Sequence, residues 1–188
     1  MVGEAAHKEV GALTDRSGIA AGRRRSPEPG GGSPYVMLGL ATVGFAINFW
    51  AWALISPLGP LFRGTGALGE LSESDVSLMV AVPVIVGSLG RIVVGALTDT
   101  YGGRVMFPLV SAVTVLPVLF LAFFALDSYA LILVGGFFLG IGGTAFAVGV
   151  PFVNAWFPPE RRGLAIGIFG AGMGGTAISA LTTVKLWD

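Results

Sequence analysis

Charged positions divide most of this chain into long uncharged stretches. Five stretches carry no charge, or in one case a single arginine, and each has the ~20 apolar residues that cross a bilayer. They run over residues 35–62, 76–98, 105–126, 128–159 and 163–184. The pattern predicts five membrane-spanning helices and hence an all-α polytopic membrane protein.

Composition supports this interpretation. The chain is 54% hydrophobic and only 12% charged, whereas soluble domains carry about 25% charged residues. It has no cysteine, and its one histidine, His7, lies in a polar segment, so neither a thiolate or histidine metal site nor a catalytic triad is expected. A net charge of zero gives no indication of nucleic-acid binding. We therefore expect neither an enzyme nor a cofactor.

The N-terminal segment differs from the rest. Residues 1–34 are small, polar and rich in glycine and proline, and they contain too little apolar surface to form a core. Three arginines at 23–25 are followed by SPEPGGGSP instead of the apolar region that a signal peptide has. We expect a disordered cytosolic tail over 1–34 and a helical domain over 35–188.

Basic residues near the span ends predict the orientation. With the N-terminus inside, the cytoplasmic flanks hold six arginines and the outer flanks hold Arg63 and Lys185. The six are Arg23, Arg24, Arg25, Arg104, Arg161 and Arg162. This asymmetry favours a cytoplasmic N-terminus in the cytoplasmic (plasma) membrane.

Short motifs predict how the spans begin, end and pack. Ser72 and Asp75 have the spacing of a helix N-cap, and the pair at 158–159 is two prolines that end the fourth span. Glycines four residues apart let membrane helices approach closely. Such pairs are Gly136 and Gly140, Gly163 and Gly167, and Gly170 and Gly174.

One span holds a charge at membrane depth. Arg91 lies seven residues before the polar end of 76–98, or roughly 10 Å along a helix. A charge there costs between ~2.5 and ~17 kcal/mol, so it calls for an explanation. Gly87, Ser88 and Gly95 share its helix face, which is small and partly polar and favours an arginine facing a cavity. The alternatives are an arginine that reaches the inner headgroups and a buried structural pair.

The spans contain no Asp, Glu or His at depth that would neutralise Arg91. A guanidinium is planar, permanently charged and bidentate, so it matches planar oxyanions in both sign and geometry. We expect a small, exchangeable anion as its partner. The lack of a titratable acid favours anion exchange, or proton coupling through residues outside this chain.

The stretch GALTDTYGGR at 95–104 resembles the G-x-L-x-D-R-x-G-R-R motif between helices 2 and 3 of the major facilitator superfamily. Matching residues are Gly95, Leu97, Asp99, Gly102 and Arg104, while Thr100 and Gly103 stand where basic residues are usual. In that superfamily the acid of this motif helps to latch the inner gate. The resemblance therefore implies a gating role for this motif and the N-terminal helix bundle of that fold.

Finer features resemble the nitrate/nitrite porter family. Arg91 falls where that family holds its substrate arginine, and Phe146 matches the phenylalanine that packs against the flat anion. Asn48, Ser88 and Thr144 either add hydrogen bonds to the anion or bond their own helix backbone. The helix 5 motif G-A-G-N-x-G-T is matched by Gly170, Ala171, Gly172, Gly175 and Thr176, with Met173 in place of asparagine.

The resemblance covers residues 35–188. Porters of this superfamily have twelve helices in two halves with the site between them. The resemblance thus implies a fragment or truncated product that ends after helix 5 and lacks its partner half with a second substrate arginine. We expect nitrate or nitrite uptake or exchange, as in nitrate assimilation, by a longer porter containing this segment. The alternatives are a porter of another small monovalent anion and a membrane fragment that transports nothing.

Overall fold

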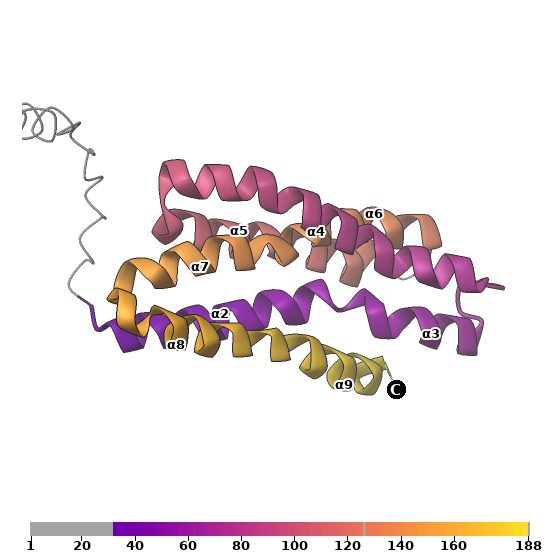
Figure 1. Ribbon diagram of the computed structural model, residues 1–188. Helices are drawn as coiled ribbons and strands as arrows, with labels where there is room; N and C mark the ends of the chain where they lie inside the picture. Colours follow the sequence, from indigo (N-terminus) through magenta and orange to yellow (C-terminus); the bar gives the residue numbers. More distant parts are fainter. Residues whose placement is uncertain (1–31, 126, 188) are drawn as a thin grey trace, which may run out of the picture. The chain divides into compact units, whose positions relative to one another are not determined.

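A computed structural model describes residues 32–125 and 127–187 as helices packed side by side (Figure 1). The α-helices are α2 (Pro34–Trp52), α3 (Ile55–Thr65), α4 (Glu73–Tyr101), α5 (Gly103–Phe120), α6 (Tyr129–Leu139), α7 (Ala145–Trp156), α8 (Pro159–Gly170) and α9 (Gly175–Trp187). One π-helical turn, η1 (Leu121–Ala125), extends α5, and two 3-10 turns, η2 (Gly140–Thr144) and η3 (Ala171–Gly174), join consecutive helices.

These elements form five segments that are long and apolar enough to cross a membrane. The segments are Pro34–Thr65, Glu73–Tyr101, Gly103–Ala125, Tyr129–Trp156 and Pro159–Lys185. The five predicted spans are therefore confirmed, with ends that differ by a few residues. Of the expected disordered tail, residues 1–31 lie outside the described part of the chain, and α2 begins at Pro34.

Large apolar side chains cover the outside of this bundle. Ile92, Phe123 and Leu164 are 73%, 74% and 72% exposed, and many other Leu, Val and Phe side chains are exposed beside them. A surface of this kind is stable in hydrocarbon, where the helices satisfy their own backbone hydrogen bonds. The chain is a multi-pass membrane protein.

The first span is broken, which its apolar pattern did not predict. α2 ends at Trp52 and α3 begins at Ile55. Pro57 has no N–H to bond the carbonyl of Ala53, and Ser56 donates to that carbonyl instead at 3.1 Å. The break makes Trp52 the last residue of α2, where its indole Nε1 donates to the carbonyl of Pro83 on α4 at 3.3 Å.

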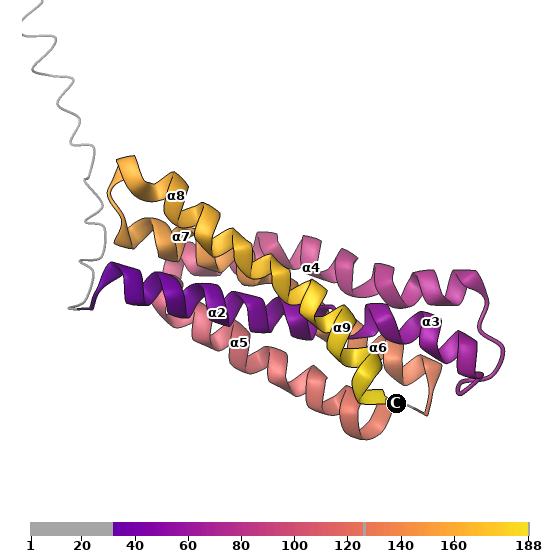
Figure 2. The same ribbon diagram turned by 90° about the horizontal axis from the view of Figure 1, so that it is seen from below.

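The central element of the described bundle is α2. It packs against elements of the third, fourth and fifth spans, namely α5, α7, α8, η2, η3 and α9. Figure 2 shows the fifth span crossing over it. Phe45 of α2 stacks on Phe169 of α8 with ring centroids 4.5 Å apart, and Phe146 of α7 lies 5.7 Å from Phe45. This aromatic cluster fixes α7 and α8 against α2.

Only some of the predicted glycine pairs pack. A Cβ at Gly136 would lie 3.0 Å from Ile55 Cδ1 on α3. A Cβ at Gly140 would lie 2.7 Å from Val86 Cβ on α4. The other two pairs are Gly163 with Gly167 and Gly170 with Gly174. They make no packing contact within the described bundle, since a Cβ at any of these four glycines would have nothing within 4 Å. That expectation was wrong because the fifth span turns a different glycine face towards α2, formed by Gly172 and Gly175.

The predicted ends of the second and fourth spans are confirmed. Ser72 is the N-cap of α4: its hydroxyl accepts from the Asp75 N–H at 3.2 Å, and the Asp75 carboxylate accepts from the Ser72 N–H at 2.9 Å. The fourth span ends at Trp156, and Pro159 is the first residue of α8.

The capping pair gives a stability prediction. We expect Ser72→Ala to lower the free energy of unfolding by about 0.5–2 kcal/mol, because the first turn of α4 loses its side-chain acceptor. Ser77→Ala is a matched control, since the Ser77 hydroxyl only donates to the Glu73 carbonyl of its own helix. Amide hydrogen exchange in the first turn of α4 is the measurement. Equal exchange rates in Ser72→Ala and the unmodified chain would contradict the prediction.

Candidate functional site

Arg91 extends from α4 to the fourth span. Its Nε donates to the carbonyl of Gly143 in η2 at 3.3 Å. The side chain is exposed, and Nη1 and Nη2 have no hydrogen-bond or ion-pair partner among the described residues. The guanidinium is therefore held at one nitrogen, and its two terminal nitrogens form a fork that is free within the described residues.

The direction of this contact bears on how deep the charge lies. Gly87, one turn before Arg91 on α4, lies beside Gly143, since a Cβ at Gly87 would be 3.6 Å from Gly143 Cα. Arg91 is about 15 Å along α4 from its end at Tyr101, and Gly143 is level with a point about 6 Å further from that end, at 1.5 Å per residue. The side chain thus points away from the near end of the bundle, which is the opposite of snorkelling.

The crossing of α4 and η2 is built from glycine. A Cβ at Gly87 would lie 2.9 Å from the carbonyl of Gly140, and one at Gly90 would lie 3.0 Å from Thr144 Cγ2. A Cβ at Gly143 would lie 3.0 Å from Trp52 Nε1. Because no side chain separates the two backbones, the Gly143 carbonyl comes within reach of Arg91.

Two of the predicted site residues are close in the chain to Arg91 or to its acceptor Gly143. Ser88 is exposed on the preceding turn of α4, and its hydroxyl has no hydrogen-bond partner in the described residues. Phe146 follows Gly143 by three residues and hence lies on the same side of the fourth span. Its ring stacks on Phe169 at 6.1 Å and is half-buried. Arg91 and Phe146 do not form a cation–π contact within the described part of the chain.

The other two polar candidates use their protons inside the bundle. The Nδ2 of Asn48 donates to the Gly44 carbonyl and to the Ser111 hydroxyl, both at 2.8 Å, which ties α2 to α5. Its buried Oδ1 has no hydrogen-bond partner, and an oxygen acceptor would repel an anion. Thr144 is buried and donates to the Ile141 carbonyl at 2.7 Å. Both side chains thus donate to backbone carbonyls of their own spans.

The helix 5 signature divides into two faces. A side chain at Gly172 would lie 2.7 Å from Phe45 Cδ1, and one at Gly175 would collide with the Ala46 carbonyl, so both glycines are needed for the contact with α2. The remaining members point elsewhere. Gly170 has open space, Met173 is 51% exposed, and the Thr176 hydroxyl donates to the Met173 carbonyl at 2.9 Å.

The predicted gating motif forms the tight turn between α4 and α5. Gly102 is the single residue between the helices and has φ +81°, which favours glycine. Arg104 lies over the Trp156 ring. Asp99 is exposed, with no ion pair in the described residues, and a side chain at Gly95 would have open space. A latch through Asp99 is thus not formed between residues that the structure describes.

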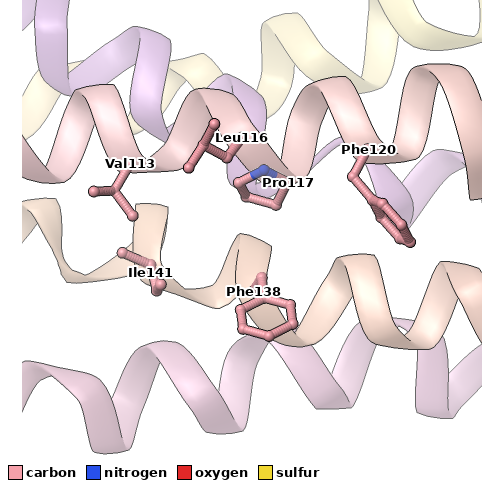
Figure 3. A pocket seen from close by; sticks show the side chains of 6 residues that line it. All are labelled: Val113, Leu116, Pro117, Phe120, Phe138 and Ile141. Atoms are coloured by element: carbon pink, nitrogen blue, oxygen red, sulfur yellow. The ribbon is translucent and has the colours of Figure 1, made fainter.

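Several grooves on the described bundle are not lined by Arg91; one of them is lined by Arg104 among apolar side chains, and the others are apolar. One of about 240 Å³ lies between α5 and the fourth span, where Pro117 and Phe138 face each other (Figure 3). Its other lining residues are Val113, Leu116, Phe120 and Ile141. It has no polar side chain to fix an anion, and Arg91 does not line it. The candidate site is thus an exposed face and not one of these grooves.

Sequence reasoning missed Gly143, which accepts from Arg91, and Trp52, whose indole lies beside Gly143. Gly143 and Trp52 belong to different spans and have no motif of their own. The glycine-rich run GIGGT at 140–144 is the signal for a close approach in the fourth span. It does not indicate which helix makes that approach, since this depends on the tertiary arrangement.

Known proteins are similar to this chain in sequence. The probable nitrate/nitrite transporter NarK2 of Mycobacterium tuberculosis is 50% identical over 147 residues, which are 78% of this chain and 36% of that protein. The probable nitrate transporter NarT of Staphylococcus aureus is 38% identical over 143 residues, or 76% of this chain and 36% of its own length. The chain thus spans about a third of the length of these relatives. The model of the Major Facilitator Superfamily matches residues 41–183, and the chain therefore belongs to that superfamily.

Proposed function

We propose that this chain is the part of a membrane porter that binds a small planar anion, nitrate or nitrite, through Arg91. The observation that carries the proposal is the free Nη1–Nη2 fork of an arginine held in mid-span with no acidic partner among the described residues. Two parallel N–H donors match two oxygens of one anion. The names of the relatives from Mycobacterium tuberculosis and Staphylococcus aureus support the same substrate class.

The surroundings of Arg91 support a weakly hydrated anion. Ser88 adds one hydroxyl donor on the same face, and Phe146 adds a flat apolar wall one turn beyond Gly143. An aromatic face is electron-rich, so it contributes shape and dehydration instead of attraction. Nitrate and nitrite lose little hydration in such a place, whereas sulfate and phosphate lose much. Asn48 and Thr144 have no role in this proposal, because their protons are already used.

A second candidate substrate is another small monovalent anion. Met173 is exposed on the fifth span at the place where the related motif has asparagine, so one amide donor is absent there. A carboxylate such as formate also presents two oxygens to a guanidinium fork. A titration that compares formate with nitrate separates these two candidates.

The test is a titration of the purified chain in lipid nanodiscs with ¹⁵N-labelled arginine. We expect nitrate and nitrite to shift the Nη signals of Arg91 with a Kd on the order of 1 mM, because a few charge-assisted bonds supply only a few kcal/mol. Arg63, which pairs with Glu73 at 3.2 Å, is the internal control. Formate binding more tightly than nitrate would favour the second candidate. Identical shifts at Arg63 and Arg91 would contradict a site at Arg91.

The proposed location is the cytoplasmic membrane with the N-terminus inside. Arg104, Arg161 and Arg162 lie at the end of the bundle where α2 begins (Figure 1), and Arg161 donates to the Tyr35 hydroxyl there at 3.0 Å. Arg63 and Lys185 lie at the opposite end. Basic residues gather on the cytoplasmic side of membrane proteins, which supports this orientation.

Reporter fusions test the orientation. We expect a reporter at Gly103 to be cytoplasmic and one after Lys185 to be external, because an even and an odd number of spans precede these points. Paired alkaline phosphatase and fluorescent protein fusions at each point provide the measurement. The reverse pattern would overturn the proposed orientation.

A further inference from the structure

We infer that Gly143 and Trp52 are positioning residues that restrict Arg91 to end-on binding of two oxygens of one anion. The inference rests on the proposed function, because it concerns the same arginine. It adds that the site selects anions by shape, because it favours those with two oxygens on one edge over spherical halides. The contacts of three residues carry it.

The guanidinium of an arginine has more than one edge that can bind an anion. An arginine can present a side edge, formed by Nε and one Nη, or the end edge formed by Nη1 and Nη2. In this structure Nε donates to the Gly143 carbonyl at 3.3 Å, so the side edge is occupied by the protein. Only the end edge remains for an anion, and its two donors are parallel and coplanar.

The Gly143 carbonyl is positioned by its turn and by the indole of Trp52. Gly143 belongs to the 3-10 turn η2, where backbone hydrogen-bond geometry is poorer than in an α-helix, so its carbonyl is accessible to an outside donor. A Cβ on Gly143 would lie 3.0 Å from Nε1 and 3.2 Å from Cε2 of the Trp52 indole. Gly143 thus lies between Trp52 and Arg91.

The Trp52 indole is held by α4 and by a neighbouring ring of α2. Trp52 Nε1 donates to the Pro83 carbonyl of α4 at 3.3 Å, and its ring packs 5.2 Å from Phe49. Gly87, one helical turn after Pro83, would place a Cβ 3.6 Å from the same Nε1. One side chain therefore contacts both backbones at the crossing and fixes the distance between Arg91 and its acceptor.

The experiment follows the Nε and Nη signals of Arg91 by NMR in the nanodisc-embedded chain, with Arg91→Lys used for assignment. Without anion, we expect the Arg91 Nε–H to exchange with water about ten- to a hundredfold more slowly than that of Arg104, as a charge-assisted hydrogen bond implies. Arg104 is the reference because its Nε has no hydrogen-bond partner in the described residues. Equal exchange rates would overturn the inference.

Added nitrate distinguishes the inference from the proposed function. We expect nitrate to shift the Nη signals and to leave the slow exchange of Nε unchanged, with chloride binding at least about tenfold more weakly because it offers no second oxygen. If nitrate abolishes the slow exchange of Nε, end-on restriction is wrong and the proposed function stands. If nitrate moves no Arg91 signal, the proposed function fails, and with it the end-on selection of anions.

Variants test the two positioning residues. We expect Gly143→Ala to bring Nε exchange to the rate of Arg104 and to weaken nitrate binding about tenfold, while chloride binding changes less. Trp52→Phe removes the bond to Pro83 without adding a clash, so it tests the same point if the alanine variant does not fold. Gly39→Ala on α2 is the matched control, because a Cβ there has nothing within 4 Å. Unchanged Nε exchange in Trp52→Phe or in a folded Gly143→Ala variant would overturn the role assigned to that residue.

Discussion

Replacement of Arg91 by lysine is expected to nearly abolish nitrate uptake while membrane insertion and protein level stay normal. Lysine keeps the positive charge but replaces a planar fork with a compact, strongly hydrated ammonium. Loss of one charge-assisted hydrogen bond of about 1.5–3 kcal/mol weakens anion binding roughly ten- to a hundredfold. Lysine also lacks Nε, so the bond to the Gly143 carbonyl is lost as well.

Uptake is best measured in a chimera in which this chain replaces the matching segment of the Mycobacterium tuberculosis relative. Arg63→Lys is the matched control, since Arg63 lies at the far end of the bundle and forms an exposed pair that lysine can also form. Arg91→Gln should fare no better than lysine, although it is less costly to insert. Uptake by the lysine variant equal to that of the unmodified chimera would show that Arg91 supplies charge without geometry.

Features that depend on local chemistry were predictable from the sequence. The five spans follow from hydrophobic length, and the cap formed by Ser72 and Asp75 follows from their spacing. The boundary at Trp156 follows from the two prolines after it. In each case the residues that decide the structure are neighbours in the chain, so no knowledge of packing is needed.

Features that depend on which helix faces which were not predictable. Asn48 had the composition of an anion ligand, yet Ser111, sixty-three residues away, takes one of its protons. The break after Trp52 depends on Pro57, but its consequence is a contact with Pro83 on another span. Arg91 was identified from its depth and small neighbours, while its acceptor Gly143 lies fifty-two residues away.

The glycines of the fifth span show the same limit, since composition does not say which of them touch a neighbour. Gly174 and Gly175 are adjacent in one motif. A Cβ on Gly175 would collide with the Ala46 carbonyl and lie 3.0 Å from the Trp50 nitrogen, whereas a Cβ on Gly174 would have nothing within 4 Å. Ala46 and Trp50 contribute backbone atoms there, which cannot rotate away as a side chain would.

We therefore expect Gly175→Ala to lower the free energy of unfolding by about 1–3 kcal/mol, the usual cost of overpacking, as the fifth span is pushed off α2. Gly174→Ala should be neutral or stabilising by up to about 1 kcal/mol, because alanine is the better helix former. Unfolding in mixed micelles, followed by tryptophan fluorescence, measures both changes. Since the two substitutions add the same methyl group at adjacent positions, insertion and micelle effects cancel in their difference. Equal stability of the two variants would mean that the fifth span does not approach α2 at Gly175, and the packing role assigned to the signature glycines would then be wrong.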